Sequence, residues 1–270
     1  MDGADRLKRQ TIRDFGDQWT RYRDNDGYYA SAALLADIVE PLLSATAVHG
    51  KRVADIGSGT GRIVNMLLDA GAAHVVAVEP STAFDVLVRN VHRPEAVTAL
   101  RVTGDSLPAS GDLDLVVSIG VLHHIPDPAP VMKAALGALA PGGKMLAWLY
   151  GREGNEAYLA FAEPLRALTR RFPHTLLAAV VWALYPALAA YIALARRFNV
   201  PLRDYLNNYL GKLSPEQRRL VMYDQLNPAY AKYYTRAEAI ALFERAGFAD
   251  VRVHHRHGYS WTVVGEKPAR

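Results

Sequence analysis

The sequence of 270 residues contains no cysteine. Disulfides, zinc sites with thiolate ligands and thiol nucleophiles are therefore excluded from any mechanism, and no metal site is predicted. The opening residues, MDGADRLKRQ, also lack the apolar stretch of a secretory signal, so we expect a cytoplasmic location. Half of the residues are hydrophobic, which allows a chain of this length to bury a full core.

The formal net charge is small, +4, and one segment carries all of it. Residues 151–234 hold 11 Lys and Arg against 6 Asp and Glu, whereas the rest of the chain holds 20 against 21. The sequence has no basic platform interleaved with aromatic residues, so nucleic acid is not expected as a partner.

Short apolar runs rich in β-branched residues alternate with stretches of helical periodicity through the first half of the chain. This alternation is typical of a parallel sheet covered by helices. Strands are predicted at residues 52–56, 74–79, 98–102, 113–119 and 144–150. Helices are predicted at residues 62–70, 82–91 and 128–140, the last of them stopped by Pro141-Gly142-Gly143.

The alternation stops after residue 150, and segment 151–234 is rich in Leu, Ala and Arg with helical periods. The alternation of strand-like and helix-like stretches returns at Thr235, which is a predicted N-cap with Glu238 three residues later. A helix to about residue 246 is expected to follow, with Gly247 as its C-cap. Two β-like runs at 250–255 and 259–264, joined by a short link, then predict an antiparallel pair that closes the sheet.

These elements predict an α/β fold with a sheet of parallel strands plus one antiparallel C-terminal strand, flanked by helices and carrying an α-helical lid insertion. The predicted domains are an N-terminal helical lid at 1–45, a core at 46–150, the helical insertion at 151–234 and the C-terminal part of the core at 235–270.

The segment VADIGSGTGRIV, residues 53–64, places three glycines at alternate positions between a predicted strand and a predicted helix. Glycines at such a turn leave backbone N–H groups unobstructed beside a ligand, at the positive end of the helix dipole. The dinucleotide fingerprint G-x-G-x-x-G/A fails in both frames, because its third small residue would be Arg62 or Val64. NAD is therefore disfavoured.

The turn instead reads acid-x-G-x-G-x-G, from Asp55 to Gly61. With Glu79 in VVAVEPS and with DLVVSIGVLHHIPDP at residues 114–128, the chain resembles class I methyltransferases that depend on S-adenosylmethionine (SAM). The similarity covers roughly residues 15–150 and 235–265. It implies SAM as the cofactor and a Rossmann-like class I methyltransferase sheet.

The resemblance also implies roles for individual residues. Glu79 is expected to bind both ribose hydroxyls, a task that requires two acceptor oxygens. Asp105, in GDSLP, is expected beside the adenine amine, while Trp19 and Tyr22 resemble an N-terminal lid. The implied cofactor-binding residues are Asp55, Ile56, Gly57, Ser58, Gly59, Gly61, Glu79, Pro80, Asp105, Ser106, Ser118, Ile119, Trp19 and Tyr22.

His123 and His124 follow the predicted fourth strand, at the usual crevice of an open α/β sheet. A hydroxyl acceptor must lose a proton, and a histidine can take it at neutral pH; the alternative is that both residues only shape the loop. Enzymes that methylate exocyclic amines carry Asn-Pro-Pro-Tyr where this chain has 118–121, SIGV, which disfavours nucleic-acid and protein-amide methylation. The candidates for lining the acceptor pocket, with core packing as the alternative, are Trp148, Tyr150, Tyr230, Tyr233, Tyr234 and His257.

Residues 174–195, HTLLAAVVWALYPALAAYIALA, carry no formal charge and lie between Arg170-Arg171 and Arg196-Arg197. The segment is long enough to span a membrane, but the strands on either side of it must pair in one sheet, so a spanning helix is rejected. We expect a helical cap or hairpin broken near Pro186. The core, a second subunit, a lipophilic acceptor or the membrane interface must bury its apolar surface, and the arginines favour the last two. Peripheral membrane contact through residues 170–197 is therefore expected, with a homodimer as an alternative.

The predicted function is SAM-dependent transfer of a methyl group to a hydroxyl or activated carbon of a lipophilic small molecule, such as a quinone precursor, a polyketide or a lipid-like compound. One alternative is a soluble natural-product or sugar methyltransferase whose lid is purely structural. The other is an assembly subunit that has the fold without catalysis, which the intact glycine turn and Glu79 disfavour.

Overall fold

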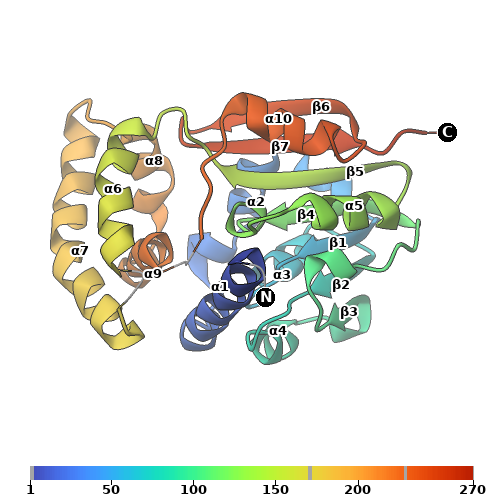
Figure 1. Cartoon of the computed structure of the whole chain (residues 1–270), viewed down its shortest axis with the longest axis horizontal. Helices are drawn as coiled ribbons and strands as arrows, with labels where there is room; N and C mark the ends of the chain where they lie inside the picture. Colours follow the sequence, from blue (N-terminus) through green and yellow to red (C-terminus); the bar gives the residue numbers. More distant parts are fainter. Residues whose placement is uncertain (1–2, 170–171, 228–229, 270) are drawn as a thin grey trace.

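A seven-stranded sheet forms the centre of the protein, in the order β3-β2-β1-β4-β5-β7-β6 (Figure 1). The computed structural model describes residues 3–169, 172–227 and 230–269. The strands are β1 (Arg52–Ile56), β2 (His74–Val78), β3 (Val97–Leu100), β4 (Leu113–Ile119), β5 (Leu139–Tyr150), β6 (Ala249–Arg256) and β7 (Ser260–Glu266). Pairs among β1 to β5 are parallel, and β7 is antiparallel to both of its neighbours, which confirms the predicted mixed sheet.

Helices cover both faces of the sheet because side chains along each strand alternate between the faces. Val53 of β1 packs in the core formed with α2, α3 and α4, whereas the next residue, Ala54, packs in the core formed with α5 and α10. These helices are α2 (Ala32–Val39), α3 (Arg62–Asp69), α4 (Phe84–Asn90), α5 (Ala129–Ala138) and α10 (Arg236–Glu244).

The segment between β5 and α10 is helical and forms one end of the molecule (Figure 1). It contains α6 (Glu156–Thr169), α7 (His174–Arg197), α8 (Arg203–Asn208) and α9 (Pro215–Leu226), and the N-terminal helix is α1 (Gly3–Arg21). Leu177 and Val181 of α7 pack against Tyr223 and Leu226 of α9 in a small core of their own. The inserted helices therefore bury apolar surface against one another as well as against the sheet domain.

The expected break near Pro186 is wrong, because α7 is one helix from His174 to Arg197. Proline removes the N–H that would bond the carbonyl of Trp182, four residues earlier. The helix nevertheless continues past Pro186 to Arg197.

The expectation that Pro141-Gly142-Gly143 stops the preceding helix is also wrong. Helix α5 already ends at Ala138, and the three residues lie inside β5. They form an irregularity in the pairing with β4, where a Cβ on Gly143 would lie 2.9 Å from the carbonyl oxygen of Leu113. Pairing with a neighbouring strand thus overrides the local turn signal.

The C-terminal elements follow their local signals. Thr235 and Glu238 form the predicted capping box, in which each side chain bonds the backbone N–H of the other residue. The link between β6 and β7 has left-handed backbone at His257 and Gly258, with φ of 50° and 70°, and joins the predicted antiparallel pair.

Candidate active site

A cavity of about 780 Å³ lies between the carboxyl ends of the parallel strands and the inserted helices. Ile56 at the end of β1, Glu79 just after β2 and Ile119 at the end of β4 contribute to its wall. Helices α1, α6, α7, α8 and α9 form the opposite side. Open α/β sheets bind ligands at this crevice, so the cavity is the candidate active site.

The glycine turn after β1 supplies a stretch of wall without side chains. Gly57, Gly59 and Gly61 have φ of 82°, 53° and 85°, in the left-handed region that favours glycine. A Cβ on Gly57 would also lie 2.4 Å from a methyl carbon of Val121. Gly57 and Gly59 line the cavity, whereas Gly61 caps α3.

Most amides of this turn already have partners within the protein, contrary to the expectation of free donors. The N–H groups of Gly57 and Ser58 donate to the carbonyl of Val78 at 2.8 and 3.0 Å. The N–H of Gly59 donates to a carboxylate oxygen of Glu79 at 2.8 Å. The turn therefore provides a fixed part of the wall without side chains. Hydrogen-bond acceptors on neighbouring residues must supply much of the polar contact with a ligand.

Glu79 supplies such acceptors at the cavity, and a second buried acid, Asp55, lies behind the turn. Glu79 accepts hydrogen bonds from the N–H groups of Gly59 and Ser81, one on each oxygen, and lines the cavity. Because a carboxylate has about four lone-pair sites, both oxygens of Glu79 keep acceptor capacity. Asp55 is 1% exposed, and its Oδ2 has no hydrogen-bond partner among the described residues. Burial raises the pKa of Asp55 to about 7, against the lowering effects of Ser58 and Arg62.

Helix α1 covers the cofactor side of the cavity. The Lys8 ammonium contacts the Asp105 carboxylate at 2.6 Å, and both residues line the cavity. Burial alone would raise the pKa of Asp105, but hydrogen bonds from Lys8 and Thr103 keep it below its ordinary value. Trp19 lies 3.5 Å from the position of a Cβ on Gly59, whereas Tyr22 packs near Tyr223, with ring centroids 5.9 Å apart.

Most of the predicted cofactor residues lie together. Those in the cavity wall are Ile56, Gly57, Ser58, Gly59, Glu79, Pro80, Asp105, Ile119 and Trp19. The others, which lie outside the wall, are Asp55, Gly61, Ser106, Ser118 and Tyr22.

The two adjacent histidines have different surroundings. His124 lines the cavity, and its Nδ1 lies 2.9 Å from the carbonyl oxygen of Tyr230. A carbonyl only accepts, so this bond assigns the proton to Nδ1 and leaves the lone pair on Nε2. Burial lowers the pKa of His124, which keeps the ring neutral at neutral pH.

His123 is fully buried and lies outside the cavity wall. Its ring stacks on Tyr150 with centroids 3.8 Å apart, and neither ring nitrogen makes a hydrogen bond of normal geometry among the described residues. Burial lowers the pKa of His123 far below its ordinary value, with smaller contributions from His124 and Arg166 and a small opposing one from the backbone of Trp148. His123 is thus a packing residue, and His124 is the better candidate for a base.

Only some of the candidates for the acceptor pocket line the cavity. Trp148, Tyr150 and Tyr233 belong to its wall. Tyr230 and Tyr234 lie outside it, although the Tyr230 carbonyl positions His124.

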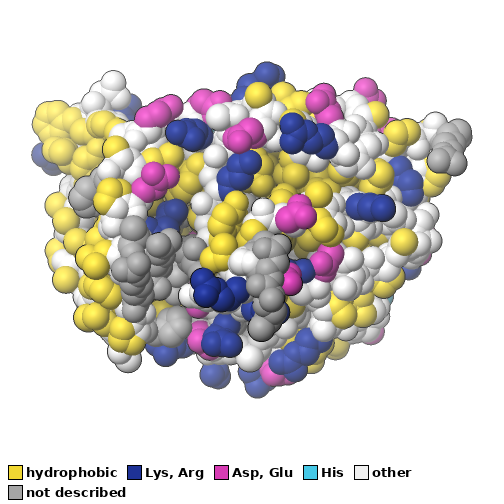
Figure 2. All heavy atoms as spheres, in the orientation of Figure 1, with side chains coloured by type: hydrophobic (Ala, Val, Ile, Leu, Met, Phe, Trp, Pro, Cys, Tyr) yellow, Lys and Arg dark blue, Asp and Glu magenta, His cyan; other side chains and the backbone are white. Residues whose placement is uncertain are grey.

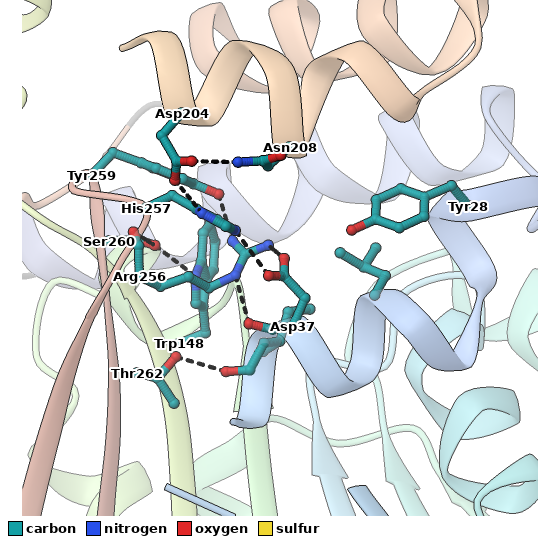
Figure 3. Close-up of polar contacts among 12 residues, drawn as sticks. Tyr28, Asp37, Trp148, Asp204, Asn208, Arg256, His257, Tyr259, Ser260 and Thr262 are labelled. Atoms are coloured by element: carbon teal, nitrogen blue, oxygen red, sulfur yellow. Dashed lines mark hydrogen bonds and ion pairs between the residues drawn. The ribbon is translucent and has the colours of Figure 1, made fainter. Parts of the chain in front are cut away.

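His257 also lies outside the wall, and it connects the insertion to the sheet domain instead (Figure 3). Its imidazole contacts Asp37 of α2 at 2.8 Å and also Asp204 of α8. The hydrogen bond to Asp37 raises the pKa of His257 despite partial burial. Arg256 beside it is 2% exposed, pairs with Asp37 and donates to the Tyr259 hydroxyl.

Sequence reasoning missed a polar network in the wall. The Tyr150 hydroxyl donates to Asp224 at 3.1 Å and accepts from the Gln225 amide at 2.9 Å. The Asp224 carboxylate also accepts from Gln18 of α1 at 3.0 Å. The hydroxyl of Tyr158 on α6 donates to the Gln225 oxygen at 2.9 Å. The only sequence signal was the place of Gln18 within FGDQWTRY, the segment compared with a lid.

The residues of the glycine turn and the two buried acids fit the chemical groups of SAM. Gly57 and Gly59 line the cavity with backbone alone, Glu79 has lone pairs for ribose hydroxyls, and Asp55 holds an unpartnered carboxylate oxygen behind the turn. SAM carries a sulfonium and an ammonium group, which buried acids stabilise. When bound, it would supply an electrophilic methyl group on a thioether leaving group.

Comparisons with known proteins agree with this fit. A family described as "Methyltransferase domain" matches residues 54–147. The chain is 33% identical over 136 residues to a tRNA U34 carboxymethyltransferase of Alcanivorax borkumensis, covering 49% of this chain and 42% of that protein. It is 31% identical over 130 residues to a ubiquinone biosynthesis O-methyltransferase of Idiomarina loihiensis, covering 42% of this chain and 52% of that protein. The chain thus spans about half the length of the curated relatives it matches.

The fold is shared with solved methyltransferases. An S-adenosylmethionine-dependent methyltransferase of Mesorhizobium loti superimposes with a TM-score of 0.53 at 19% identity, over 87% of this chain and 98% of that one. Residues 54–147 therefore match a methyltransferase domain, the chain shares the fold of a solved SAM-dependent methyltransferase, and the residues at its crevice fit S-adenosylmethionine.

Proposed function

We propose that the protein transfers a methyl group from SAM to a hydroxyl or activated carbon of a lipophilic small molecule. One observation carries the proposal. A single cavity of about 780 Å³ extends from Gly57 and Glu79 past His124 to apolar side chains of the inserted helices. Its volume is in the range of pockets that enclose drug-sized ligands.

His124 is the proposed base for a hydroxyl acceptor. Nε2 of His124 would accept the proton that the acceptor hydroxyl loses, and SAM, when bound, would supply the methyl group together with a neutral thioether as the leaving group. The Tyr230 carbonyl holds the ring in the tautomer that this transfer needs. For a carbon acceptor the same nitrogen would remove the proton whose loss makes the carbon nucleophilic.

The far wall of the cavity supports a lipophilic acceptor. Leu188 of α7, Leu206 of α8 and Leu220 of α9 line it, and Leu34 of α2 closes it from the sheet domain. Polar side chains such as Asp224, Gln225 and Tyr233 interrupt this apolar lining, and the Tyr233 hydroxyl donates to the Gln225 oxygen at 3.1 Å. This combination suits an acceptor with one polar end and an apolar body.

The relatives include both a ubiquinone biosynthesis O-methyltransferase and tRNA U34 carboxymethyltransferases. The first agrees in chemistry with the proposal. The enclosing helices favour a small molecule as the acceptor. Helix α1 and the insertion cover the crevice that a tRNA nucleotide would have to enter.

The test is transfer of labelled methyl from SAM to a panel of long-chain phenols, matched short hydrophilic phenols and total tRNA, with mass analysis of the products. We expect product from the long-chain phenols only. His124→Gln keeps a donor for the Tyr230 carbonyl and is expected to lower turnover by about 10²-fold or more. His123→Phe, which keeps the stacked ring, is the matched control and should retain most activity.

SAM affinity of each variant, measured by calorimetry, separates loss of the base from loss of the cofactor site. Methylated tRNA without a methylated phenol would refute the choice of acceptor. Equal turnover of His124→Gln and the unaltered protein on a phenol would refute the base.

A further inference from the structure

Helix α7 presents an apolar face to solvent. The segment Thr175–Arg197 has a mean hydropathy of 2.0, and 17% of its most apolar stretch is buried. Trp182 is 62% exposed and Phe198, the next residue after the helix, is 58% exposed. Figure 2 shows hydrophobic side chains along the edge where Figure 1 places α7. A soluble surface seldom keeps so many large apolar side chains together without a partner.

The opposite face of α7 is fixed to the protein. Leu177, Val181, Ile192 and Ala195 are buried, and the helix packs on α8 and α9. The insertion leaves the sheet after β5 and returns before β7, and these two strands are paired neighbours. A single crossing would separate them, so α7 is suited to lie on a bilayer and not to span it.

Basic residues accompany this apolar face. The segment His174–Arg197 contains no Asp or Glu, and Arg196 and Arg197 are exposed in its last turn. The Arg219 guanidinium of α9 lies 4.2 Å from the ring centroid of Trp182. A Trp ring with adjacent arginines is typical of side chains at the level of lipid headgroups. Arg170 and Arg171, predicted to flank the other end, lie outside the described residues.

We propose that the outer face of α7, defined by Trp182, Leu194 and Phe198 with Arg196 and Arg197, binds the surface of an anionic phospholipid bilayer. Charge complementarity selects this partner over a second copy of the chain. A two-fold contact between two α7 faces would have to bury the same surface of both copies, and α7 has no acidic residue to pair with its arginines.

The proposed docking places the cavity next to the lipid. Leu184 of α7 is 36% exposed and also belongs to the cavity wall, together with Leu188 and Tyr191. One helix therefore separates the outer surface from the acceptor site. The idea that the bilayer delivers a lipophilic acceptor rests on the proposed function. The docking itself does not depend on that function and can be measured without SAM.

The experiment is flotation of the full chain with vesicles of phosphatidylcholine, with and without phosphatidylglycerol, at low and high salt. We expect flotation with the anionic vesicles, weakened by salt. Emission from Trp182 should shift to the blue, and lipids brominated near the headgroup should quench it. Trp182→Phe keeps the apolar contact and should float while losing most of that spectral response.

Paired variants test the two parts of the surface. Arg196→Gln/Arg197→Gln should weaken partition about thirtyfold at low salt, since each cation near an anionic leaflet counts separately. Trp182→Ser/Phe198→Ser should weaken it roughly a hundredfold. The matched controls are Arg236→Gln/Arg245→Gln at α10 and Val88→Ser on α4, exposed positions away from α7, and both should float like the unaltered protein.

Circular dichroism before flotation verifies that each variant is folded. Failure to float with anionic vesicles at low salt would overturn the proposal. So would a stable dimer that Trp182→Ser/Phe198→Ser converts to a monomer, because the face would then be an interface between copies. Active methyl transfer without flotation would overturn the docking alone, whereas flotation without transfer would overturn only the proposed function.

Discussion

Asp55→Asn is expected to change the pH dependence of stability. The carboxyl group is 1% exposed, and burial raises its pKa from 3.8 to about 7. In the unfolded chain the group ionises near 3.8, so between these values the folded protein holds a proton that the unfolded chain has released. The free energy of unfolding therefore falls as pH rises from about 4 to about 7.

The size of this effect follows from the two pKa values. Each tenfold change in proton affinity corresponds to about 1.4 kcal/mol, so the whole interval is equivalent to about 4 kcal/mol. Between pH 5 and pH 8 the free energy of unfolding should fall by about 3 kcal/mol, because the decline ends near pH 7. Asparagine has nearly the same shape and does not titrate, so the variant lacks this decline.

The assay is urea unfolding of the protein and of Asp55→Asn at pH 5, 6, 7 and 8, where only the difference between the two chains matters. We expect the variant to gain stability relative to the unaltered protein as pH rises. Asp85→Asn, at an exposed carboxylate on α4, is the control for removal of a charge. Parallel stability curves for the protein and Asp55→Asn would refute the assignment.

Cofactor binding supplies a second readout of the same carboxyl group. A cationic ligand favours the ionised form, so SAM affinity should rise with pH up to about 7 and then level off. Calorimetry in buffers of different ionisation enthalpy should detect the released proton below pH 7. In Asp55→Asn the affinity for SAM should be lower, and binding should release no proton from this position. Unchanged proton release would show that another group supplies the proton.

Two further predictions concern the turn and the link to the insertion. Gly57→Ala should lower the free energy of unfolding by about 3 kcal/mol, from left-handed backbone and from contact with Val121; adding Val121→Ala should recover only the packing part, as chemical unfolding can measure. His257 has a raised pKa, so its ion pair with Asp37 stabilises the protein below pH 6.5, and this contribution is lost as pH rises through the folded pKa. His257→Gln should flatten that decline, and an unchanged profile would contradict it.

Local chemistry accounts for the elements that the sequence predicts well. The bounds of β1 and β4 agree with prediction because each is a continuous buried run between turn residues. The capping box of Thr235 and Glu238 involves residues three positions apart, so its signal lies in the sequence itself. A contact between distant elements explains the error at Pro141-Gly142-Gly143, since pairing with β4 decides the conformation of Gly143.

The candidate site divides in the same way. The turn, Glu79 and the two histidines form short motifs, and their presence in one crevice follows from parallel strands that end at one edge. The choice of His124 over His123 requires knowing that the Tyr230 carbonyl, 106 positions later in the chain, approaches only one ring. Gln18 and Asp224, 206 positions apart, have no local pattern that indicates their contact.

Polar contacts on two sides help to hold the insertion on the core, and this shapes how acceptor selection can vary. Asp224 of α9 bonds Tyr150 of β5 on the cavity side. Asp204 of α8 bonds His257 of the β6–β7 link on the other side. The cofactor residues belong to the core, and the apolar far wall belongs largely to the inserted helices α7, α8 and α9. Substitutions on the inner faces of α7 and α8 can therefore change the acceptor while the turn, Glu79 and His124 keep their geometry.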